Sequence, residues 1–248
     1  MDKVIRLLPL LAFLMFLSCS SWSKEGQVIN CAIEAHGGEL YQKVKISFDF
    51  RERHYQILKT PGRFEYSRAF TDSSGLVLDV LTNEGFRRTV DGKEISLSEE
   101  RIRAFSNSVN SVAYFAFLPY GLNDPAARKH WLGETELEGQ IYDIIKVTFD
   151  EEGGGDDFED EFLYWINKEN NQMDYLAYSY HTEGGGVRFR KAINSRMVNG
   201  IRIQDYENYM PADKSTPLEE MEALFKSGQL KLLSEIIMEN VQVELLEE

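Results

Sequence analysis

Alternation of hydrophobic and polar residues predicts that most of this chain forms antiparallel strands. In the stretch KVKISFDFR, every second residue from Val44 to Phe50 is hydrophobic and the residues between them are polar. This period of two is typical of a strand with one buried face. The same pattern predicts strands at 53–59, 63–70, 76–82, 85–90, 141–149, 160–167, 174–181, 187–195 and 201–209.

Two segments carry the helical period instead. The first runs from about 25 to 36 and is stopped by Gly37-Gly38. The second covers 99–118, where Ser96 and Glu99 offer a capping box. Its apolar stripe, which we expect to pack against a sheet, consists of Ile102, Phe105, Val109, Val112 and Ala116.

The connections are read from their turn residues. Asp91-Gly92 and Asn199-Gly200 favour tight hairpins. One short helical turn is expected at 125–129, after the second helix. A third helix is expected after Thr216-Pro217, with Glu219 in a capping box and Gly228 near its end, followed by a strand at 230–238.

These elements predict an α+β fold. No change in composition separates the strands before the 99–118 helix from those after it, so all of them are expected in one sheet and one domain, residues 26–248. The sheet should be antiparallel and strongly curved, a half-barrel with helices across its concave mouth.

The first residues have the organisation of an export signal. Lys3 and Arg6 precede an apolar run from Leu7 to Leu17, which is too short to span a membrane. The ending Leu17-Ser18-Cys19 resembles the lipobox of bacterial lipoproteins, although Phe16 stands where an aliphatic residue is usual. We therefore expect residues 1–18 to be a signal peptide, Cys19 to carry a lipid, and 19–25 to be a short tether. An ordinary signal peptide is the alternative.

The chain has two cysteines, Cys19 and Cys31. Lipidation of Cys19 would leave Cys31 without a partner, whereas a disulfide between them is the competing account. We favour lipidation because Val28, Cys31, Ile33 and Ala35 look like the buried side of the first helix. A small buried thiol needs no partner.

The charge is strongly acidic and uneven. Removing residues 1–18 takes away two positive charges and one negative charge, which changes the net charge from −14 to −15. Eight carboxylates lie between Asp150 and Glu161, around a triple glycine. The chain lacks a basic stripe that could neutralise phosphates, so we expect no nucleic-acid partner.

The acidic stretch is best explained as a solvated turn between two strands. Its spacing does not fit an EF-hand, and its carboxylates would repel a phosphate, although a loose calcium site is a weaker alternative. A second glycine run lies at 184–186. In a meander the two glycine loops fall at the same end, so we expect them to be neighbours, with Arg188 as the cation nearest to the acidic loop.

The candidate binding residues lie on the second group of strands. Arg188 and Arg190 alternate with Val187 and Phe189, so both arginines point to one face of their strand. A solvated face with ion pairs is the simpler explanation. Alternatively, the arginines line the concave face and hold an anionic head group together with the tyrosines Tyr164, Tyr178 and Tyr180.

Catalytic motifs are weak. The four histidines show no metal spacing, and the chain has no nucleophile elbow. His36 beside Gly37-Gly38 is read as a C-terminal helix residue that favours the dipole. We expect no metal, no cofactor and no catalytic residue; the opposing hypothesis is a hydrolase that uses His36, Asp124 and Arg190.

Several long stretches resemble the uncharacterised DUF6503 family of Bacteroidetes envelope proteins: AIEAHGGELY, NSVNSVAYFAFLPYGLND, YDIIKVTFDEEGGGDDFEDEFLYWIN, DYLAYSY and RFRKAINSRMVNGIRIQDYENY. They cover most of residues 28–211. That resemblance implies kinship without a known activity. More distantly, the order of elements resembles the lipoprotein-carrier half-barrels of the LolA and LolB type, which implies an apolar cavity able to hold an acyl chain.

The leading hypothesis is therefore an envelope lipoprotein that binds a hydrophobic or amphiphilic molecule without catalysis. Its lipid would attach it to the periplasmic face of a membrane, for which we expect the outer membrane. A scaffold lipoprotein without a small ligand is a further alternative.

The lipid attachment at Cys19 can be tested in growing cells. A clickable palmitate should label the wild-type protein and leave Cys19→Ala unlabelled, because the thiol is the only expected attachment point. Equal labelling of the two proteins would show that the cysteine after Ser18 is accidental.

Overall fold

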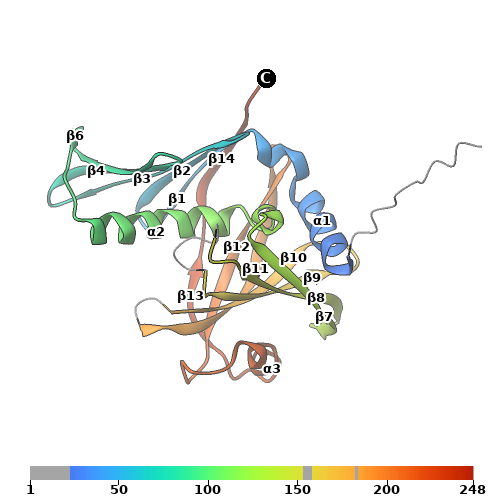
Figure 1. Ribbon diagram of the computed structural model, residues 1–248. Coiled ribbons are helices and arrows are strands. Elements are labelled where there is room, and N and C mark those ends of the chain that lie inside the picture. Colours follow the sequence, from blue (N-terminus) through green and yellow to red (C-terminus); the bar gives the residue numbers. More distant parts are fainter. Residues whose placement is uncertain (1–22, 153–157, 182–183, 248) are drawn as a thin grey trace, which may run out of the picture.

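The computed structural model describes residues 23–152, 158–181 and 184–247 and contains two seven-stranded antiparallel sheets (Figure 1). Sheet A has the strand order β14-β1-β2-β3-β4-β5-β6, and sheet B has the order β13-β12-β11-β10-β9-β8-β7. Apart from β14 and β13, each sheet is a simple meander. Successive strands therefore pair with each other, as their short connections require.

The strands of sheet A are β1 (Val44–Phe50), β2 (Arg53–Thr60), β3 (Arg63–Asp72), β4 (Gly75–Thr82), β5 (Gly85–Val90), β6 (Lys93–Glu94) and β14 (Glu239–Leu245). Those of sheet B are β7 (Ala127–Leu137), β8 (Gln140–Phe149), β9 (Glu161–Asn167), β10 (Met173–Tyr180), β11 (Gly186–Val198), β12 (Ile201–Met210) and β13 (Lys231–Ile236). The helices are α1 (Lys24–His36), α2 (Glu99–Ala116) and α3 (Met221–Lys226), with short 3₁₀ segments η1 (Gly38–Gln42), η2 (Tyr120–Asn123) and η4 (Leu218–Glu220).

The two sheets are joined where the chain passes from β13 to β14. β13 pairs with β12 in sheet B, and two residues later β14 pairs with β1 in sheet A. The buried carboxylate of Asp205 on β12 accepts hydrogen bonds at this point from the Met238 backbone N–H (2.9 Å) and from the Arg196 guanidinium (3.0 Å). Arg196 also donates to the Met238 carbonyl at 2.7 Å. These three residues fix the position at which the chain changes sheets.

Apolar side chains fill the space on both sides of this junction. Sheet A and the start of β12 share one core, in which Ile46, Phe48 and Ile57 meet Ile201 and Ile203. Sheet B has an inner face, covered by α1 and η2, and an outer face, covered by η4 and α3. Buried residues of the inner face include Ile145, Phe162, Tyr164, Leu176 and Tyr206, and those of the outer face include Leu163, Trp165, Tyr175, Val187 and Phe189.

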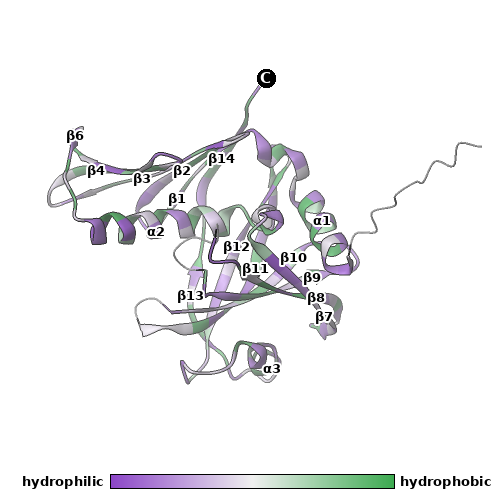
Figure 2. Cartoon of the chain, viewed as in Figure 1, coloured by the Kyte–Doolittle hydropathy of each residue, from purple (hydrophilic) through white to green (hydrophobic). Residues whose placement is uncertain are grey.

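Helix α2 lies across sheet A and ends at the junction with sheet B (Figure 1). Its first part is held by a buried charge cluster, in which Asp79 accepts hydrogen bonds from Arg68 (2.6 Å) and Arg88 (2.5 Å). Arg68 also donates to Ser108 of α2 at 2.7 Å, and Arg88 lies 3.7 Å from the centre of the Phe105 ring. Both hydrophobic and hydrophilic residues occur along α1 and α2, as expected for amphipathic helices (Figure 2).

Most elements agree with the sequence pattern, including the α+β class and the curved antiparallel arrangement of strands. The expectation of a single sheet was wrong, because the last strands divide their pairing between two sheets. The short helical turn expected at 125–129 was also wrong. Pro125 and Ala126 form a turn, and β7, an eleven-residue edge strand, begins at Ala127. Polar residues occupy most positions of β7, so its sequence shows no hydrophobic alternation.

The phase of the first helix was misread as well. Its buried residues are Val28, Ile29, Ala32, Ile33 and His36, at true helical spacing, and Cys31 is exposed. The argument from a buried thiol therefore does not hold. Helix α2 is capped by Ser98, whose hydroxyl accepts from the Arg101 N–H, rather than by Ser96.

The expected stripe of α2 is buried only in its second half. Val109 is fully buried, Phe105 is half-buried, and Ile102 is 36% exposed. Ahead of α3, no side chain caps the 3₁₀ turn, because Thr216 bonds instead to the Asp213 carbonyl. Within the described ranges, no helix combines the length and apolar character needed to cross a membrane.

The Asp205 junction gives a stability test. Asp205→Asn removes the charge that neutralises Arg196, whose side chain is 34% exposed. It should lower the free energy of unfolding by about 2 kcal/mol, a usual contribution of hydrogen bonds to a charged group. The exposed Glu239, at the start of β14, supplies a matched control, and Glu239→Gln should change stability by less than about 0.5 kcal/mol. Urea unfolding of both variants measures the difference. Equal midpoints would mean that the junction contributes nothing.

Candidate functional site

The inner face of sheet B brings together the residues that the sequence singled out. Tyr164 lies on β9, Tyr178 and Tyr180 lie on β10, and Arg188 and Arg190 lie on β11. Arg188 is the direct cross-strand partner of Tyr178, and Val187 and Phe189 face the opposite side of the sheet. Both arginines therefore occupy the same face, as their alternation predicted.

Arg190 is a buried cation, with 8% of its surface exposed. Its guanidinium lies 3.9 Å from the ring centre of Phe115 on α2 and donates one hydrogen bond, at 2.8 Å, to the Tyr178 hydroxyl. Its Nε atom is buried without a hydrogen-bond partner, and among the described residues no carboxylate lies within ion-pair distance. The solvated face with ion pairs is therefore the wrong explanation for Arg190.

A second unpartnered atom accompanies this guanidinium. Asn208 on β12 is the direct cross-strand neighbour of Arg190, so the two side chains share one face. Asn208 is 6% exposed, and its Oδ1 atom has no hydrogen-bond partner. Buried polar atoms are normally satisfied. The Arg190–Asn208 pair therefore presents hydrogen-bonding capacity that the protein itself does not use.

Buried tyrosines form the wall behind this pair. The hydroxyls of Tyr114 on α2 and Tyr164 lie 2.6 Å apart, and Gln204 donates to the Tyr206 hydroxyl at 2.7 Å. Burial raises the pKa of Tyr206 to about 12 and raises the pKa of Tyr114 and Tyr164 further. These tyrosines stay neutral at physiological pH and can offer hydrogen bonds, but not a charge.

Arg188 and Tyr180 lie at the rim of the same face. The Arg188 guanidinium is 5.1 Å from the Tyr180 ring centre and donates to the Val187 carbonyl at 2.8 Å. At this end of the sheet, His181 Nδ1 lies 3.4 Å from Asp160, so the end of the β8–β9 connection lies beside the start of the β10–β11 connection. The predicted approach of the two glycine runs, and the pairing of Arg188 with the acidic loop, involve residues 153–157 outside the described ranges.

The residues of the hydrolase hypothesis do not share a site. His36 is fully buried at the end of α1, where its Nδ1 lies 2.8 Å from the Ala32 carbonyl. Asp124 is exposed and accepts from the Ala126 N–H, and Arg190 contacts Phe115 and Tyr178. Burial lowers the pKa of His36 to about 4, so this histidine is neutral and does not act on the helix dipole as expected.

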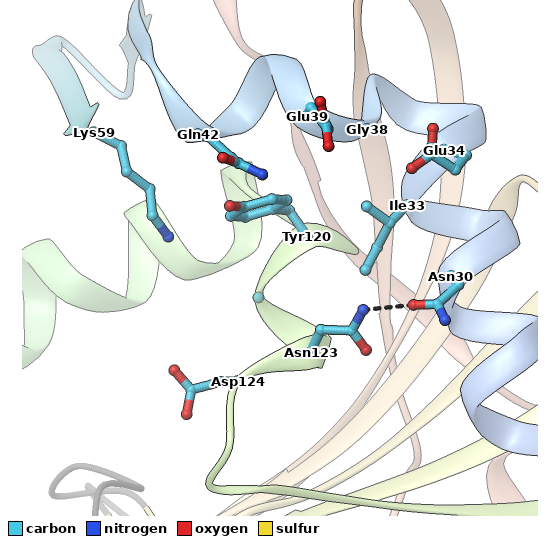
Figure 3. Close-up of a pocket in the computed structure, with 11 residues that line it drawn as sticks. Asn30, Ile33, Glu34, Gly38, Glu39, Gln42, Lys59, Tyr120, Asn123 and Asp124 are labelled. Atoms are coloured by element: carbon cyan, nitrogen blue, oxygen red, sulfur yellow. Dashed lines mark hydrogen bonds between the residues drawn. The ribbon is translucent and has the colours of Figure 1, made fainter. Parts of the chain in front are cut away.

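A separate open pocket lies where α1, η1, β2 and η2 meet (Figure 3). Its volume is about 460 Å³. Most of its lining is polar or charged, and includes Asn30, Glu34, Glu39, Lys59, Asn123 and Asp124. Asn123 donates to Asn30 at 2.7 Å across its floor. This pocket differs from the apolar cavity that an acyl chain would require.

Lys59 is the distinctive group of this pocket. Its ammonium lies 4.7 Å from the ring centre of Tyr120 and 5.7 Å from that of Phe117. Partial burial lowers the pKa of Lys59, and the Asp124 carboxylate opposes that change. A cation on two aromatic faces is a stable arrangement by itself, so the lysine does not require a ligand to explain its position.

The sequence analysis missed Phe115, Tyr114 and Asn208. Tyr114 and Phe115 lie outside the apolar stripe assigned to α2. Two large aromatic side chains outside that stripe were the signal in the sequence that could have identified them. Asn208 follows the alternation of β12 but resembled an ordinary exposed polar position. In the described parts of the chain, no three His, Cys, Asp or Glu side chains are grouped as metal ligands.

The chain belongs to DUF6503, a family of unknown function whose model matches residues 4–240. No curated protein matches the chain. The family assignment confirms the kinship inferred from the long aromatic stretches and adds no activity.

Three solved structures show a likeness at low identity. A LolA superfamily protein from Nitrosomonas europaea is 13% identical, with 92% of this chain and 95% of that chain covered and a TM-score of 0.49. An outer membrane lipoprotein-sorting protein domain from Vibrio parahaemolyticus is 10% identical over 89% and 95%, with a TM-score of 0.43. The lipoprotein LppX from Mycobacterium tuberculosis is 10% identical over 64% and 88%, with a TM-score of 0.28.

His36 should make stability depend on pH. An unfolded histidine titrates near pH 6.5, whereas burial lowers the pKa of His36 to about 4 in the fold. Between these values the unfolded chain binds the extra proton, so the free energy of unfolding should fall as the pH drops from 6.5 to 4. The gap corresponds to roughly 3 kcal/mol.

Urea unfolding at several pH values measures this slope. His36→Gln should remove the part of the pH dependence of the free energy of unfolding that comes from His36. His54→Gln, at an exposed histidine, should retain that pH dependence. A slope unchanged by His36→Gln would contradict the burial of a neutral imidazole.

Proposed function

We propose that this protein is an exported lipoprotein that binds an anionic amphiphile, such as a lipid, on the inner face of sheet B. Arg190 and Asn208 would hold the anionic head group, and Tyr164, Tyr178, Tyr180 and Arg188 would surround it. Cys19 would anchor the protein to the periplasmic face of the outer membrane. We propose binding without catalysis and a single folded unit over residues 26–248.

The observation that carries this proposal is the buried Arg190 guanidinium without a carboxylate. Transfer of an unpaired charge from water into a protein interior costs several kcal/mol, even after relaxation. The Phe115 and Tyr178 rings recover part of that energy through cation–π contact. An anion that accepts a hydrogen bond from Nε, and has no hydrogen bond to donate to the tyrosines, would recover much more of this free energy.

The surroundings favour an amphiphile over a small ion. Phe162, Leu176 and Tyr206 lie on the same face as Arg190, so a ligand with an apolar chain would replace protein contacts of similar character. Neutral tyrosine hydroxyls next to the guanidinium can bind a head group, and their raised pKa values make them poor acids or bases. Both features support binding rather than chemistry.

Access requires movement of the end of α2. Phe115 covers the Arg190 guanidinium, and the Tyr114–Tyr164 hydrogen bond holds the same turn on sheet B. Only Val109 and Ala113 of the eighteen residues of α2 are fully buried. Displacement of the last turn would break the Tyr114–Tyr164 hydrogen bond and the ring contacts of Tyr114 and Phe115, as a local opening without global unfolding.

Ligand charge provides the test. The soluble Cys19→Ala protein should bind dansyl-undecanoic acid more tightly than its uncharged methyl ester, as measured by dansyl fluorescence. Arg190→Gln should weaken binding of the acid at least about tenfold and leave the ester unchanged, because only the acid pairs with the guanidinium. Arg188→Gln, at the neighbouring half-buried position, is the matched control and should have a smaller effect.

A stability measurement separates a ligand-binding arginine from a structural one. Without ligand, Arg190→Met should be at least as stable as the wild type, since it removes an unpaired buried charge. Equal acid affinity in wild type and Arg190→Gln, or a large loss of stability in Arg190→Met, would contradict the proposal.

A further inference from the structure

The start of α1 lies against the edge strand β7 (Figure 1). The Lys24 ammonium is 3.2 Å from Asp143 of β8 and 5.7 Å from the ring centre of Trp131 on β7. Trp131 donates its indole N–H to the same carboxylate at 2.7 Å. The start of α1 is therefore held at one edge of sheet B, the edge formed by β7.

That edge exposes large apolar side chains. Trp131 is 40% exposed, Leu132 at the adjacent β-bulge is 50% exposed, and Ile141 on β8 is 44% exposed. Ile141 and Asp143 are two residues apart on one strand and so point to one face. Clustered exposed apolar residues on an edge strand mark an interaction surface. We call Trp131, Leu132 and Ile141 the edge patch.

Three carboxylates near the edge patch are paired with cations, although the whole chain carries a net charge of −14. Arg128 pairs with Asp150, and Lys168 pairs with Glu134. Lys24 pairs with Asp143, whose side chain is 8% exposed. Glu136, the cross-strand partner of Ile141, is exposed and has no ion pair among the described residues, so these pairs reduce the repulsion from an anionic surface but do not remove it.

The length of the tether indicates which partner the edge patch would meet. If Cys19 carries the lipid, five residue steps connect it to Lys24, and a fully extended chain of that length spans at most about 18 Å. The start of α1, and with it the edge patch, must then stay close to the bilayer. Tryptophan is the side chain most favoured at the boundary between lipid and water.

From these observations we infer that the edge patch docks on the bilayer that holds the Cys19 anchor, with Trp131 at the interface. The inference rests on the lipidation in the proposed function and adds an orientation: the edge formed by β7 and the start of α1 faces the membrane. A lipid chain and an interfacial contact together give firmer attachment than either does alone.

Quenching of tryptophan fluorescence by brominated lipid tests this contact. The full chain, isolated with its lipid and reconstituted into phosphatidylcholine vesicles, should carry Trp22→Phe, which leaves Trp131 and the buried Trp165. Brominated phosphatidylcholine should quench this protein, and additional Trp131→Phe should abolish the quenching. Leu132→Asp should reduce it at least about twofold, since it places a charge in the contact.

The matched control is Leu233→Asp on β13, at the opposite edge of sheet B, where Leu233 is 47% exposed. This variant should be quenched like its parent. Flotation with the vesicles reports the anchor separately. A protein that floats without quenching of Trp131 overturns the docking inference and leaves lipidation intact, whereas a protein that does not float refutes both. Loss of quenching as protein density rises would assign the patch to a second copy of the chain instead.

Discussion

The constraint on which this fold depends is the two-residue passage from sheet B to sheet A. A chain that pairs with β12 through β13 and with β1 through β14 must turn away from one partner before it meets the other. Asp205 and Arg196 hold the Met238 backbone at that point. The backbone N–H and C=O groups between β13 and β14 pair with neither sheet, so side chains must provide their hydrogen bonds. The curvature between the sheets follows from this single bend.

Helix α2 responds to the same geometry with two different attachments. Its first half is fixed to sheet A by charge, through the Arg68–Ser108 hydrogen bond above the Asp79 cluster. Its second half meets sheet B through Tyr114 and Phe115, which make one hydroxyl contact, one cation–π contact and ring contacts with Phe149, Phe162 and Tyr178. The helix is therefore held mainly by charge at one end and by aromatic packing at the end that covers Arg190.

Strand positions could be predicted because alternation is a local property, recorded in each segment independently. Pairing between β14 and β1 joins residues about two hundred positions apart, so no local pattern announces the second sheet. Exposure of Cys31 was missed because Val28, Cys31 and Ala35 also have helical spacing, whereas the face that is buried runs through Ile29, Ala32 and His36. For the site, alternation placed Arg188 and Arg190 on one face, but the burial of Arg190 depends on Phe115 of a distant helix.

The internal arginines explain why the missing partner of Arg190 is informative. Arg68, 4% exposed, meets the carboxylate of Asp79, and Arg196 meets Asp205. At these two positions the chain supplies a carboxylate to the arginine, whereas Arg202, like Arg190, has a buried Nε atom without a hydrogen-bond partner. At Arg190 it supplies a phenol, two aromatic faces and an amide oxygen that itself lacks a donor. A carboxylate at that position would neutralise the guanidinium permanently, and the anion binding that we propose depends on its absence.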